Sequence, residues 1–141
     1  MRMIQLVDVE AEKKEIKHIF NEHLSAYDKK DLNKTVDMFS EDVIIQRANI
    51  PQFQGKKALK EDYKRSFESL KNSTSSTTEE GMYIEISSSG DIAWSCGPYT
   101  THYETTGDTR IVKGKYICTW RKVDDKWKIS AFCATSSLPE T

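Results

Sequence analysis

The most regular alternation of apolar and polar residues lies in the last third of the chain, over residues 113–133. Aromatic and β-branched residues favour strands there, and the pair Asp124-Asp125 predicts a turn between two of them. With a two-residue loop, one face of this hairpin collects apolar side chains from both strands. The pairs on that face are Val123 with Lys126, Trp120 with Ile129, Cys118 with Ala131 and Tyr116 with Cys133. The other face pairs Arg121 with Lys128, Thr119 with Ser130 and Ile117 with Phe132. The pattern predicts a sheet that is covered on one face.

The first half of the chain has helical spacing instead. Asp8 and Asp31 are candidate N-caps, because each precedes a run in which apolar residues recur at three- and four-residue steps. His23 lies on the apolar stripe of the first run. The expected elements are a helix from Asp8 to about Asp28, a short helix after Asp31, a strand over 43–48 and a helix from Lys56 to about Leu70.

The second half predicts strands separated by turns. Residues 72–78 are almost all Ser and Thr, which favours a loop, and an alternating strand follows over 82–86. A longer strand is expected over 92–104, where Gly97-Pro98 predicts a bulge or an edge. Helices followed by four long strands predict an α+β fold, with the N-terminal helices packed on a curved antiparallel sheet. Such a sheet and its helices enclose a cone-shaped pocket.

Length and charge narrow the range of functions. The 141 residues predict a single domain over 1–141, with an ordered core from about 9 to 135. A net charge of −1 without a basic cluster argues against nucleic acid or a membrane surface as partner. No stretch is apolar enough for a signal peptide or a membrane span, so we expect a cytoplasmic protein. The three cysteines and three histidines lack the spacing of a metal site, so we expect free thiols and no metal.

Three segments together resemble a known superfamily. They are AYDKKDLNKTVDMFSEDV, FQGKKALKEDYKRSF, and GDIAWSCGPYTTHYE with GKYICTWRKVDDKWKIS. In this order, from about Ile16 to Cys133, the chain resembles the nuclear-transport-factor-2-like superfamily, in its SnoaL-like branch with a cystatin-like fold. The resemblance implies the α+β cone and a homodimer. It does not select an activity, because the superfamily includes isomerases, dehydratases, epoxide hydrolases, polyketide cyclases and domains that only bind or dimerise.

The enzyme patterns of this superfamily match the chain in part. A ketosteroid isomerase would need a carboxylate base near Arg47, and a SnoaL-type cyclase would need an acid near 130–133, where the chain has none. The scytalone dehydratases are more similar, because their Tyr-Asp pair falls on Tyr27 and Asp28 and one of their histidines falls on His102. Their other histidine is replaced by Ser and Thr. By this resemblance His102 is the candidate base, Tyr27 the candidate hydrogen-bond donor and Asp28 the residue that orients one of them, without a cofactor.

Which face of the 92–104 strand lines the pocket depends on the length of the turn at Thr106-Gly107-Asp108, because a one-residue change exchanges the two faces. One choice turns inward Trp94, Cys96, Thr100 and His102, and the other turns inward Ser95, Tyr99, Thr101 and Tyr103. The dehydratase comparison favours the first choice, and even loop lengths favour the second. We expect His102 to face in, and the expected ligand-binding residues are His23, Trp94, Tyr116 and Trp120.

Two functions of different classes agree with these residues. The first is a cofactor-free lyase or isomerase that acts on a small apolar or aromatic metabolite through His102, Tyr27 and Asp28. The alternative is a non-catalytic ligand-binding or dimerisation module. In both cases we expect a homodimer through the convex sheet face, because Ile117 and Phe132 form an apolar pair there.

Overall fold

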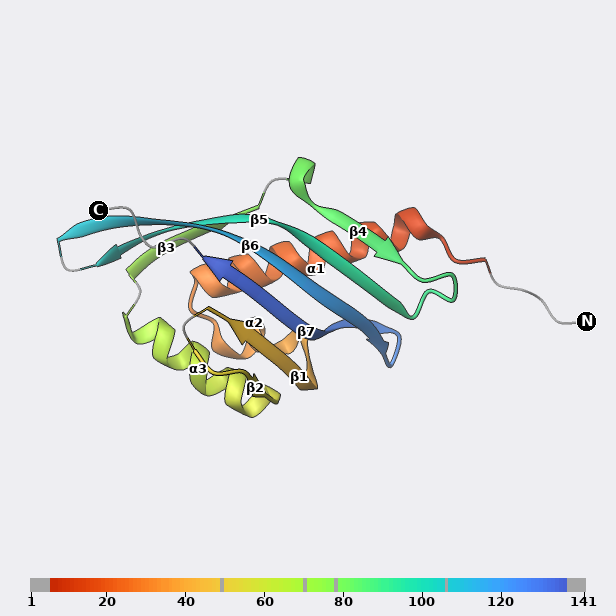
Figure 1. Cartoon of the computed structure of the whole chain (residues 1–141), viewed down its shortest axis with the longest axis horizontal. Helices are drawn as coiled ribbons and strands as arrows, with labels where there is room; N and C mark the ends of the chain where they lie inside the picture. Colours follow the sequence, from red (N-terminus) through yellow and green to blue (C-terminus); the bar gives the residue numbers. More distant parts are fainter. Residues whose placement is uncertain (1–5, 49, 70, 78, 106, 137–141) are drawn as a thin grey trace, which may run out of the picture.

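The computed structural model describes residues 6–48, 50–69, 71–77, 79–105 and 107–136 (Figure 1). Its helices are α1 (Val9–Asp28), α2 (Leu32–Asp37) and α3 (Lys56–Ser69), and a short 3-10 turn is η1 (Glu79–Gly81). Its strands are β1 (Phe39–Arg47), β2 (Phe53–Gln54), β3 (Lys71–Ser76), β4 (Tyr83–Ile86), β5 (Ile92–Thr105), β6 (Asp108–Val123) and β7 (Lys126–Ser136). The predicted ends at Leu70 and Thr78, the turn residue Thr106 and the segment beyond 136 lie outside the described residues. Within the described ranges, no helix is long and apolar enough to cross a membrane.

The first two helices begin where the sequence predicts caps. The Asp8 carboxylate accepts a hydrogen bond from the Ala11 amide at 3.1 Å, and the Asp31 carboxylate accepts one from the Lys34 amide at 3.2 Å. Both predicted caps are confirmed. Helix α1 buries one stripe of its surface, which holds Ile16, Phe20, His23 and Ala26. This stripe faces the sheet, so that His23 lies inside the protein.

In the described part of the chain the strands form one seven-stranded sheet, and one of its pairs is parallel. The order along the sheet is β2-β1-β7-β6-β5-β3, and β4 pairs with the first part of β5. Strand β1 runs parallel to β7, whereas the other paired strands are antiparallel. The predicted antiparallel sheet is thus a mixed sheet with one parallel pair. This pair joins two strands that are far apart in the sequence, which no local pattern indicates.

Strand β3 forms where the Ser- and Thr-rich composition predicts a loop, so the loop prediction is wrong. It pairs antiparallel with the second part of β5. On its helix side, the Asp28 carboxylate accepts hydrogen bonds from the Ser75 amide at 2.7 Å and from the Ser73 hydroxyl at 3.2 Å. Serine has little intrinsic preference for strands, and here partners on both sides stabilise the strand instead.

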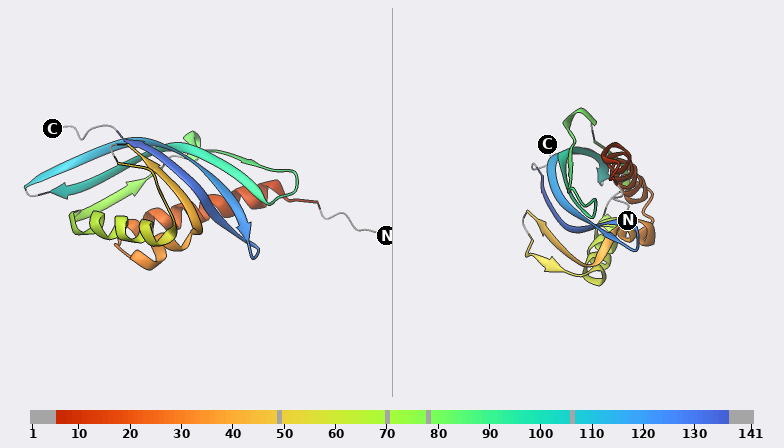
Figure 2. Two further views of the ribbon diagram at one scale, coloured as in Figure 1. Left: turned by 60° about the horizontal axis from the view of Figure 1, so that its bottom comes forward. Right: turned by 90° about the vertical axis from the view of Figure 1, so that its right-hand side faces the viewer.

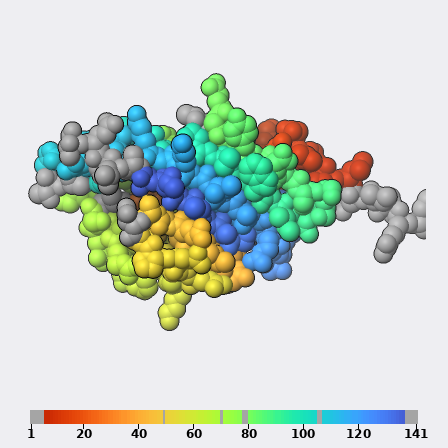
Figure 3. All heavy atoms as spheres, viewed as in Figure 1, coloured from red at the N-terminus to blue at the C-terminus, as the bar shows by residue number. Residues whose placement is uncertain are grey.

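The sheet curves around the helices and leaves its other face open. Figure 2 shows α1, α2 and α3 on the concave side of the sheet. Figure 3 shows the opposite face, where β1, β7, β6 and β5 lie side by side without a helix over them. The core fills the space between the sheet and the helices, and its most deeply buried large side chains include Trp120, Phe39, Ile16, Ile45 and Leu59. The predicted α+β arrangement of helices on a curved sheet is confirmed.

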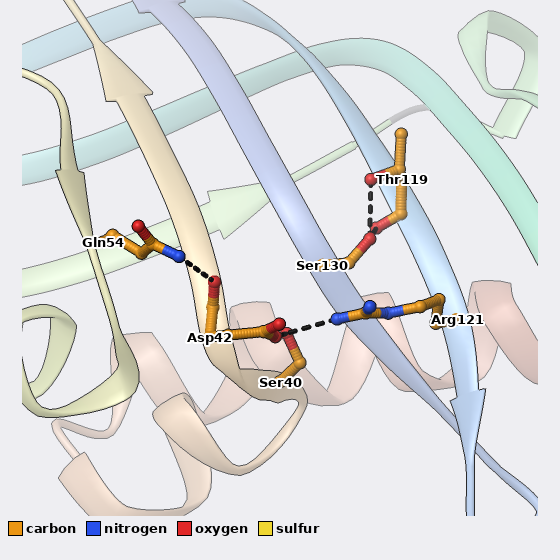
Figure 4. Close-up of polar contacts among 6 residues, drawn as sticks. All are labelled: Ser40, Asp42, Gln54, Thr119, Arg121 and Ser130. Atoms are coloured by element: carbon orange, nitrogen blue, oxygen red, sulfur yellow. Dashed lines mark hydrogen bonds and ion pairs between the residues drawn. The ribbon is translucent and has the colours of Figure 1, made fainter.

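The β6–β7 hairpin has the predicted turn but a different register beyond Ser130. Near the turn the predicted pairs are present, as Trp120 lies opposite Ile129. Ser130 is then an extra residue in β7, so that Thr119 pairs with Ala131. Figure 4 shows how Ser130 is held: its hydroxyl lies 2.7 Å from the Thr119 hydroxyl and donates to the Thr119 carbonyl oxygen at 3.2 Å.

This bulge reverses the orientation of the rest of β7. Phe132 pairs with Cys118 and turns inward, where its ring is stacked parallel to Tyr116 at a centroid distance of 6.0 Å. Cys133 takes its place on the outer face, opposite Ile117. The predicted outer pair of Ile117 and Phe132 is therefore wrong, because a one-residue insertion exchanges the faces of a strand. Ile117 itself is on the outer face and is 51% exposed.

Strand β5 pairs with β6 without interruption, from Ile92 opposite Arg121 to Thr105 opposite Asp108. Gly97-Pro98, for which a bulge or an edge is predicted, makes no bulge in this ladder. On the other side of β5 it lies at an edge, between the residues that pair with β4 and those that pair with β3. An unbroken ladder preserves the alternation of faces along β5. Of the two faces that could line the pocket, the second one named in the sequence analysis is therefore the correct one. The inward residues are Ser95, Tyr99, Thr101 and Tyr103. Trp94 and His102 are exposed on the opposite face, so the prediction that they line the pocket is wrong.

Candidate functional site

A cavity lies between the concave face of the sheet and helices α1 and α3, and we call it the inner cavity. Its volume is about 130 Å³. Most of its wall is aromatic or aliphatic, and neither Asp nor Glu is among the described residues that line it. The lining residues are Phe20, His23, Leu24, Tyr27, Ile45, Arg47, Leu59, Tyr63, Ser75, Tyr99, Thr101, Tyr116, Phe132 and Ala134. An apolar wall with a few polar groups is typical of small-molecule sites.

A second, wider cavity adjoins the first, and we call it the outer cavity. Its volume is about 400 Å³. The two cavities share the wall residues Tyr27, Arg47, Tyr99, Thr101 and Ala134. The outer cavity also borders Ile50, which is 40% exposed, and so reaches the protein surface. The shared residues therefore form the passage into the inner cavity.

His23 is the polar group of α1 that lies deepest in the inner cavity. Its side chain is only 5% exposed, and its Nδ1 lies 3.1 Å from the carbonyl oxygen of Thr35. A carbonyl oxygen only accepts hydrogen bonds, so Nδ1 carries the proton and Nε2 is the unprotonated, acceptor nitrogen. The Tyr63 hydroxyl donates to Nε2 at 3.4 Å, which is long for a hydrogen bond.

Burial also sets the charge of this imidazole. It lowers the pKa of His23 to about 4, against the smaller opposing effects of the Thr35 carbonyl and the Asp28 carboxylate. His23 is therefore neutral at pH 7, and its Nε2 is an unprotonated base within a mainly apolar wall. The fixed tautomer and the lack of charge are both conditions for a general base.

Tyrosines supply the hydroxyl groups around His23. Tyr27 and Tyr63 pack edge to face at a centroid distance of 5.9 Å. Burial raises the pKa of Tyr27 to about 12, and burial likewise raises the pKa of Tyr63. Both hydroxyls are thus protonated at neutral pH and are available as hydrogen-bond donors.

The sheet side of the cavity is built by stacked rings. Tyr116 stacks on Phe20 at 4.4 Å and on Phe132 at 6.0 Å. Tyr99 lies against Gly114, its partner in the β5–β6 ladder, and donates from its hydroxyl to the Thr135 carbonyl oxygen at 3.1 Å. A Cβ at Gly114 would lie 2.3 Å from the Tyr99 ring, so glycine is needed for this packing.

Arg47 is the cationic residue of the passage. It ends β1 with its side chain on the concave side and forms an ion pair with Asp62 of α3. Its guanidinium carbon lies 5.9 Å from the centroid of the Tyr63 ring and 6.0 Å from that of Phe53. These rings and the carboxylate hold the guanidinium between the two cavities.

Asp28 serves the fold rather than the cavity. Its two carboxylate oxygens accept from Ser73 and Ser75, as described above, and so join the end of α1 to β3. It borders a shallow surface hollow on the other side of β3 and does not line the inner cavity. These hydrogen bonds hold the end of α1, which carries Tyr27, against β3.

The seven residues predicted from the sequence divide into two groups. His23, Tyr27 and Tyr116 meet in the inner cavity. His102 and Trp94 face outward, Asp28 lies behind the cavity wall, and Trp120 is fully buried in the core. The Trp120 indole donates to the Ser95 hydroxyl at 2.9 Å and is absent from the cavity wall. The predicted convergence of His102 with Tyr27 and Asp28 is therefore not found.

The cavity residues that were not predicted from the sequence include Arg47, Tyr63 and Phe132. Arg47 occurs two residues after Ile45, so strand alternation already places both on one face. Tyr63 lies on the apolar stripe of α3, and such a position by itself indicates a core residue. Phe132 enters the cavity only because of the bulge at Ser130, for which the local sequence has no clear signal.

Among the described residues, no group of three or more His, Cys, Asp or Glu side chains is arranged to hold a metal ion. The thiols of Cys96, Cys118 and Cys133 are free. Burial raises the pKa of Cys118 to about 12, which keeps this thiol protonated.

A model of the SnoaL-like domain family matches residues 9–132 of the sequence. The chain belongs to the SnoaL-like domain family. No curated protein matches this sequence. The match covers every helix and nearly the whole sheet, from the start of α1 to Phe132 in β7.

Solved structures resemble this SnoaL-like domain over most of its length. A putative scytalone dehydratase from Novosphingobium aromaticivorans has a TM-score of 0.83 at 17% identity, over 92% of this chain and 87% of that one. A type 2 hexachlorocyclohexane dehydrochlorinase (LinA) has a TM-score of 0.83 at 14% identity, over 95% and 92%. A ketosteroid isomerase-like protein from Erwinia carotovora atroseptica has a TM-score of 0.74 at 18% identity, over 89% and 96%. These structures confirm the nuclear-transport-factor-2-like fold, and at such identities they establish the fold alone.

Proposed function

We propose that this SnoaL-like domain is a cofactor-free lyase or isomerase that acts on a small cyclic organic molecule, with His23 as general base. The observation that carries the proposal is the state of His23, a neutral imidazole with its Nδ1 proton held by Thr35 and its Nε2 lone pair in the inner cavity. The likeness to a putative dehydratase, a dehydrochlorinase and an isomerase-like protein supports the reaction class by analogy.

The proposed reaction begins with removal of a proton from a carbon next to a carbonyl group. Nε2 of His23 takes the proton, the carbonyl becomes an enolate, and the Tyr27 hydroxyl donates a hydrogen bond to the enolate oxygen. In an isomerase, His23 returns the proton to another carbon. In a lyase, the enolate expels a β-hydroxyl group, and His23 gives its proton to that oxygen so that water leaves. The apolar wall keeps His23 uncharged until the proton arrives. Because the same burial disfavours the imidazolium, the step relies on the negative charge of the enolate that forms beside it.

The size of the inner cavity limits the ligand. An apolar cavity of ~150 Å³ is known to hold benzene, and the inner cavity has a volume of about 130 Å³. The inner cavity is slightly smaller than this benchmark, so a single six-membered ring is the largest group that we expect it to take, and a fused polycyclic molecule is too large. Larger substituents have to extend through the passage into the outer cavity, whose volume is about 400 Å³.

Hydrogen–deuterium exchange of cyclohexanone in heavy water tests this proposal, because the α-protons of the ketone exchange when a base removes them. We expect the wild-type protein to accelerate exchange, and His23→Gln to remove at least about 100-fold of the acceleration. His102→Gln is the matched control, since His102 is an exposed histidine outside the cavity. Equal exchange in the wild type and His23→Gln contradicts the role of His23, and no acceleration in the wild type contradicts the proposed activity.

A second function, dimerisation, is favoured by the outer face of the sheet. The exposed apolar residues near its centre include Tyr83 on β4 at 65%, Trp94 on β5 at 41%, Ile117 on β6 at 51% and, beyond β7, Ile44 on β1 at 37% exposure. Figure 4 shows the polar border of this face, where Arg121 on β6 donates to Asp42 on β1 at 2.8 Å. An apolar centre with a polar border is characteristic of protein interfaces.

The shape around Ile117 supports a second copy of the chain as the partner. Shallow hollows lie on both sides of this side chain, one next to Pro98 and one next to Ile44. In a two-fold dimer the same surface meets itself, so Ile117 of one copy can fill a hollow of the other. We therefore propose a homodimer through the convex sheet face, centred on Ile117 instead of the predicted Ile117–Phe132 pair.

Light scattering at micromolar concentration tests this proposal. We expect the mass of two chains for the wild type and of one chain for Ile117→Lys. Val123→Lys is the matched control, because Val123 is also exposed but lies six residues further along β6, about 20 Å away. A monomeric wild type, or a dimer unaffected by Ile117→Lys, contradicts this interface.

A further inference from the structure

Arg47 and its neighbours form a charged group at the passage between the two cavities. The Asp62 carboxylate contacts Arg47 through one oxygen and lies 3.6 Å from Arg65 through the other. Two guanidinium groups thus share a single carboxylate, and the three side chains retain one net positive charge. Arg65 is 72% exposed and is screened by water, whereas only 28% of the Arg47 side chain is exposed.

The charge of Arg47 reaches into the inner cavity. Arg47 lines this cavity together with Tyr27, Tyr63 and Tyr99, and its charge opposes the effect of burial on the pKa of all three. A guanidinium has five N–H donors, and Asp62 is the only ion-pair partner of Arg47 within the described ranges. Asp62 is also the only acidic residue among the described residues that line either cavity. The passage therefore has donors and positive charge for a further acceptor.

We propose that the ligand of this site carries a carboxylate on its ring, and that Arg47 binds this carboxylate while the ring occupies the inner cavity. The inference rests on the proposed function in one respect, namely that the inner cavity binds a small ring. The planar guanidinium matches the two oxygens of a carboxylate. A ring substituent at the passage is the part of the ligand nearest to Arg47, because Arg47 lines both cavities. The specificity-determining residue thus occupies the position where an isomerase of this fold would be expected to have its carboxylate base.

Isothermal titration calorimetry with benzoate and benzamide tests this inference at pH 7. The two compounds have the same ring and nearly the same shape, and they differ in charge. We expect the wild type to bind benzoate at least about 10-fold more tightly, which corresponds to ~1.4 kcal/mol. The double variant Arg47→Gln with Asp62→Asn removes the guanidinium without leaving a buried carboxylate alone, and we expect it to lose this preference. Arg121→Gln, an arginine of the outer face, is the control that keeps it.

The outcomes separate the two proposals. If benzamide binds as tightly as benzoate, the carboxylate inference is overturned while the ring-binding cavity stands. If neither compound binds, the proposed function is overturned and the inference with it. The comparison of the two ligands in the wild type decides the question even if the double variant does not fold. Retention of the benzoate preference in a folded double variant also overturns the role of Arg47.

Discussion

The buried state of His23 makes stability depend on pH in a defined range. In the unfolded chain a histidine takes up its proton near pH 6.5, whereas folded His23 does so only near pH 4. The pKa is depressed on folding, so the stabilising effect is complete above pH 6.5 and is lost as the pH falls towards 4. The full shift in the pKa of His23 corresponds to about 3 kcal/mol of unfolding free energy. Of this, about 2 kcal/mol is lost between pH 7 and pH 5.

Urea unfolding of the wild type and of His23→Gln, followed by circular dichroism at several pH values, measures this effect. We expect the wild type to lose about 2 kcal/mol more unfolding free energy than the variant between pH 7 and pH 5. Carboxylates such as Glu12, whose pKa is lowered from 4.5 chiefly by its hydrogen bond with Lys122, contribute mainly below this window. His102→Gln should keep the wild-type slope. An equal loss of stability in the wild type and in His23→Gln would refute the reasoning, since it would mean that His23 is protonated as readily in the folded protein.

Three further substitutions probe the walls of the site. Gly114→Ala should destabilise the fold by about 1–3 kcal/mol in urea unfolding, because the new Cβ would lie 2.3 Å from both Tyr99 and the Thr135 carbonyl oxygen; a neutral effect would contradict this packing. Phe132→Ala should cost up to about 3 kcal/mol and allow a bicyclic ligand to bind in calorimetry; unchanged ligand size would show that Phe132 does not limit the cavity. Asp28→Asn should lower the unfolding free energy by about 2 kcal/mol, while the folded variant still catalyses hydrogen–deuterium exchange of the ketone. A loss of exchange without a loss of stability would show that Asp28 takes part in the reaction.

The local features of the fold could be predicted from the sequence. The caps at Asp8 and Asp31 and the turn at Asp124-Asp125 depend on neighbouring residues, and all three are where the pattern places them. The position of His23 on the buried stripe of α1 follows from the same local periodicity. Such features need no information about partners elsewhere in the chain.

The orientation of the strands could not be predicted in the same way. The inward turn of Phe132 depends on one extra residue at Ser130, and the outward turn of His102 depends on a ladder that continues through Gly97-Pro98. In each case a shift of one residue exchanges the faces of a strand, and the local composition is compatible with both results. The pairing of β1 with β7, which brings Arg47 to the cavity, is likewise decided by contacts between distant segments.

The inner cavity next to His23 is the place where we propose that a small cyclic molecule binds. A crystal structure of the protein soaked with cyclohexanone tests this binding most directly. We expect the ring between Tyr116 and Tyr63, with a carbon next to the carbonyl about 3–3.5 Å from Nε2 of His23. A ketone bound only in the outer cavity or on the convex sheet face, with the inner cavity occupied by water alone, would contradict it.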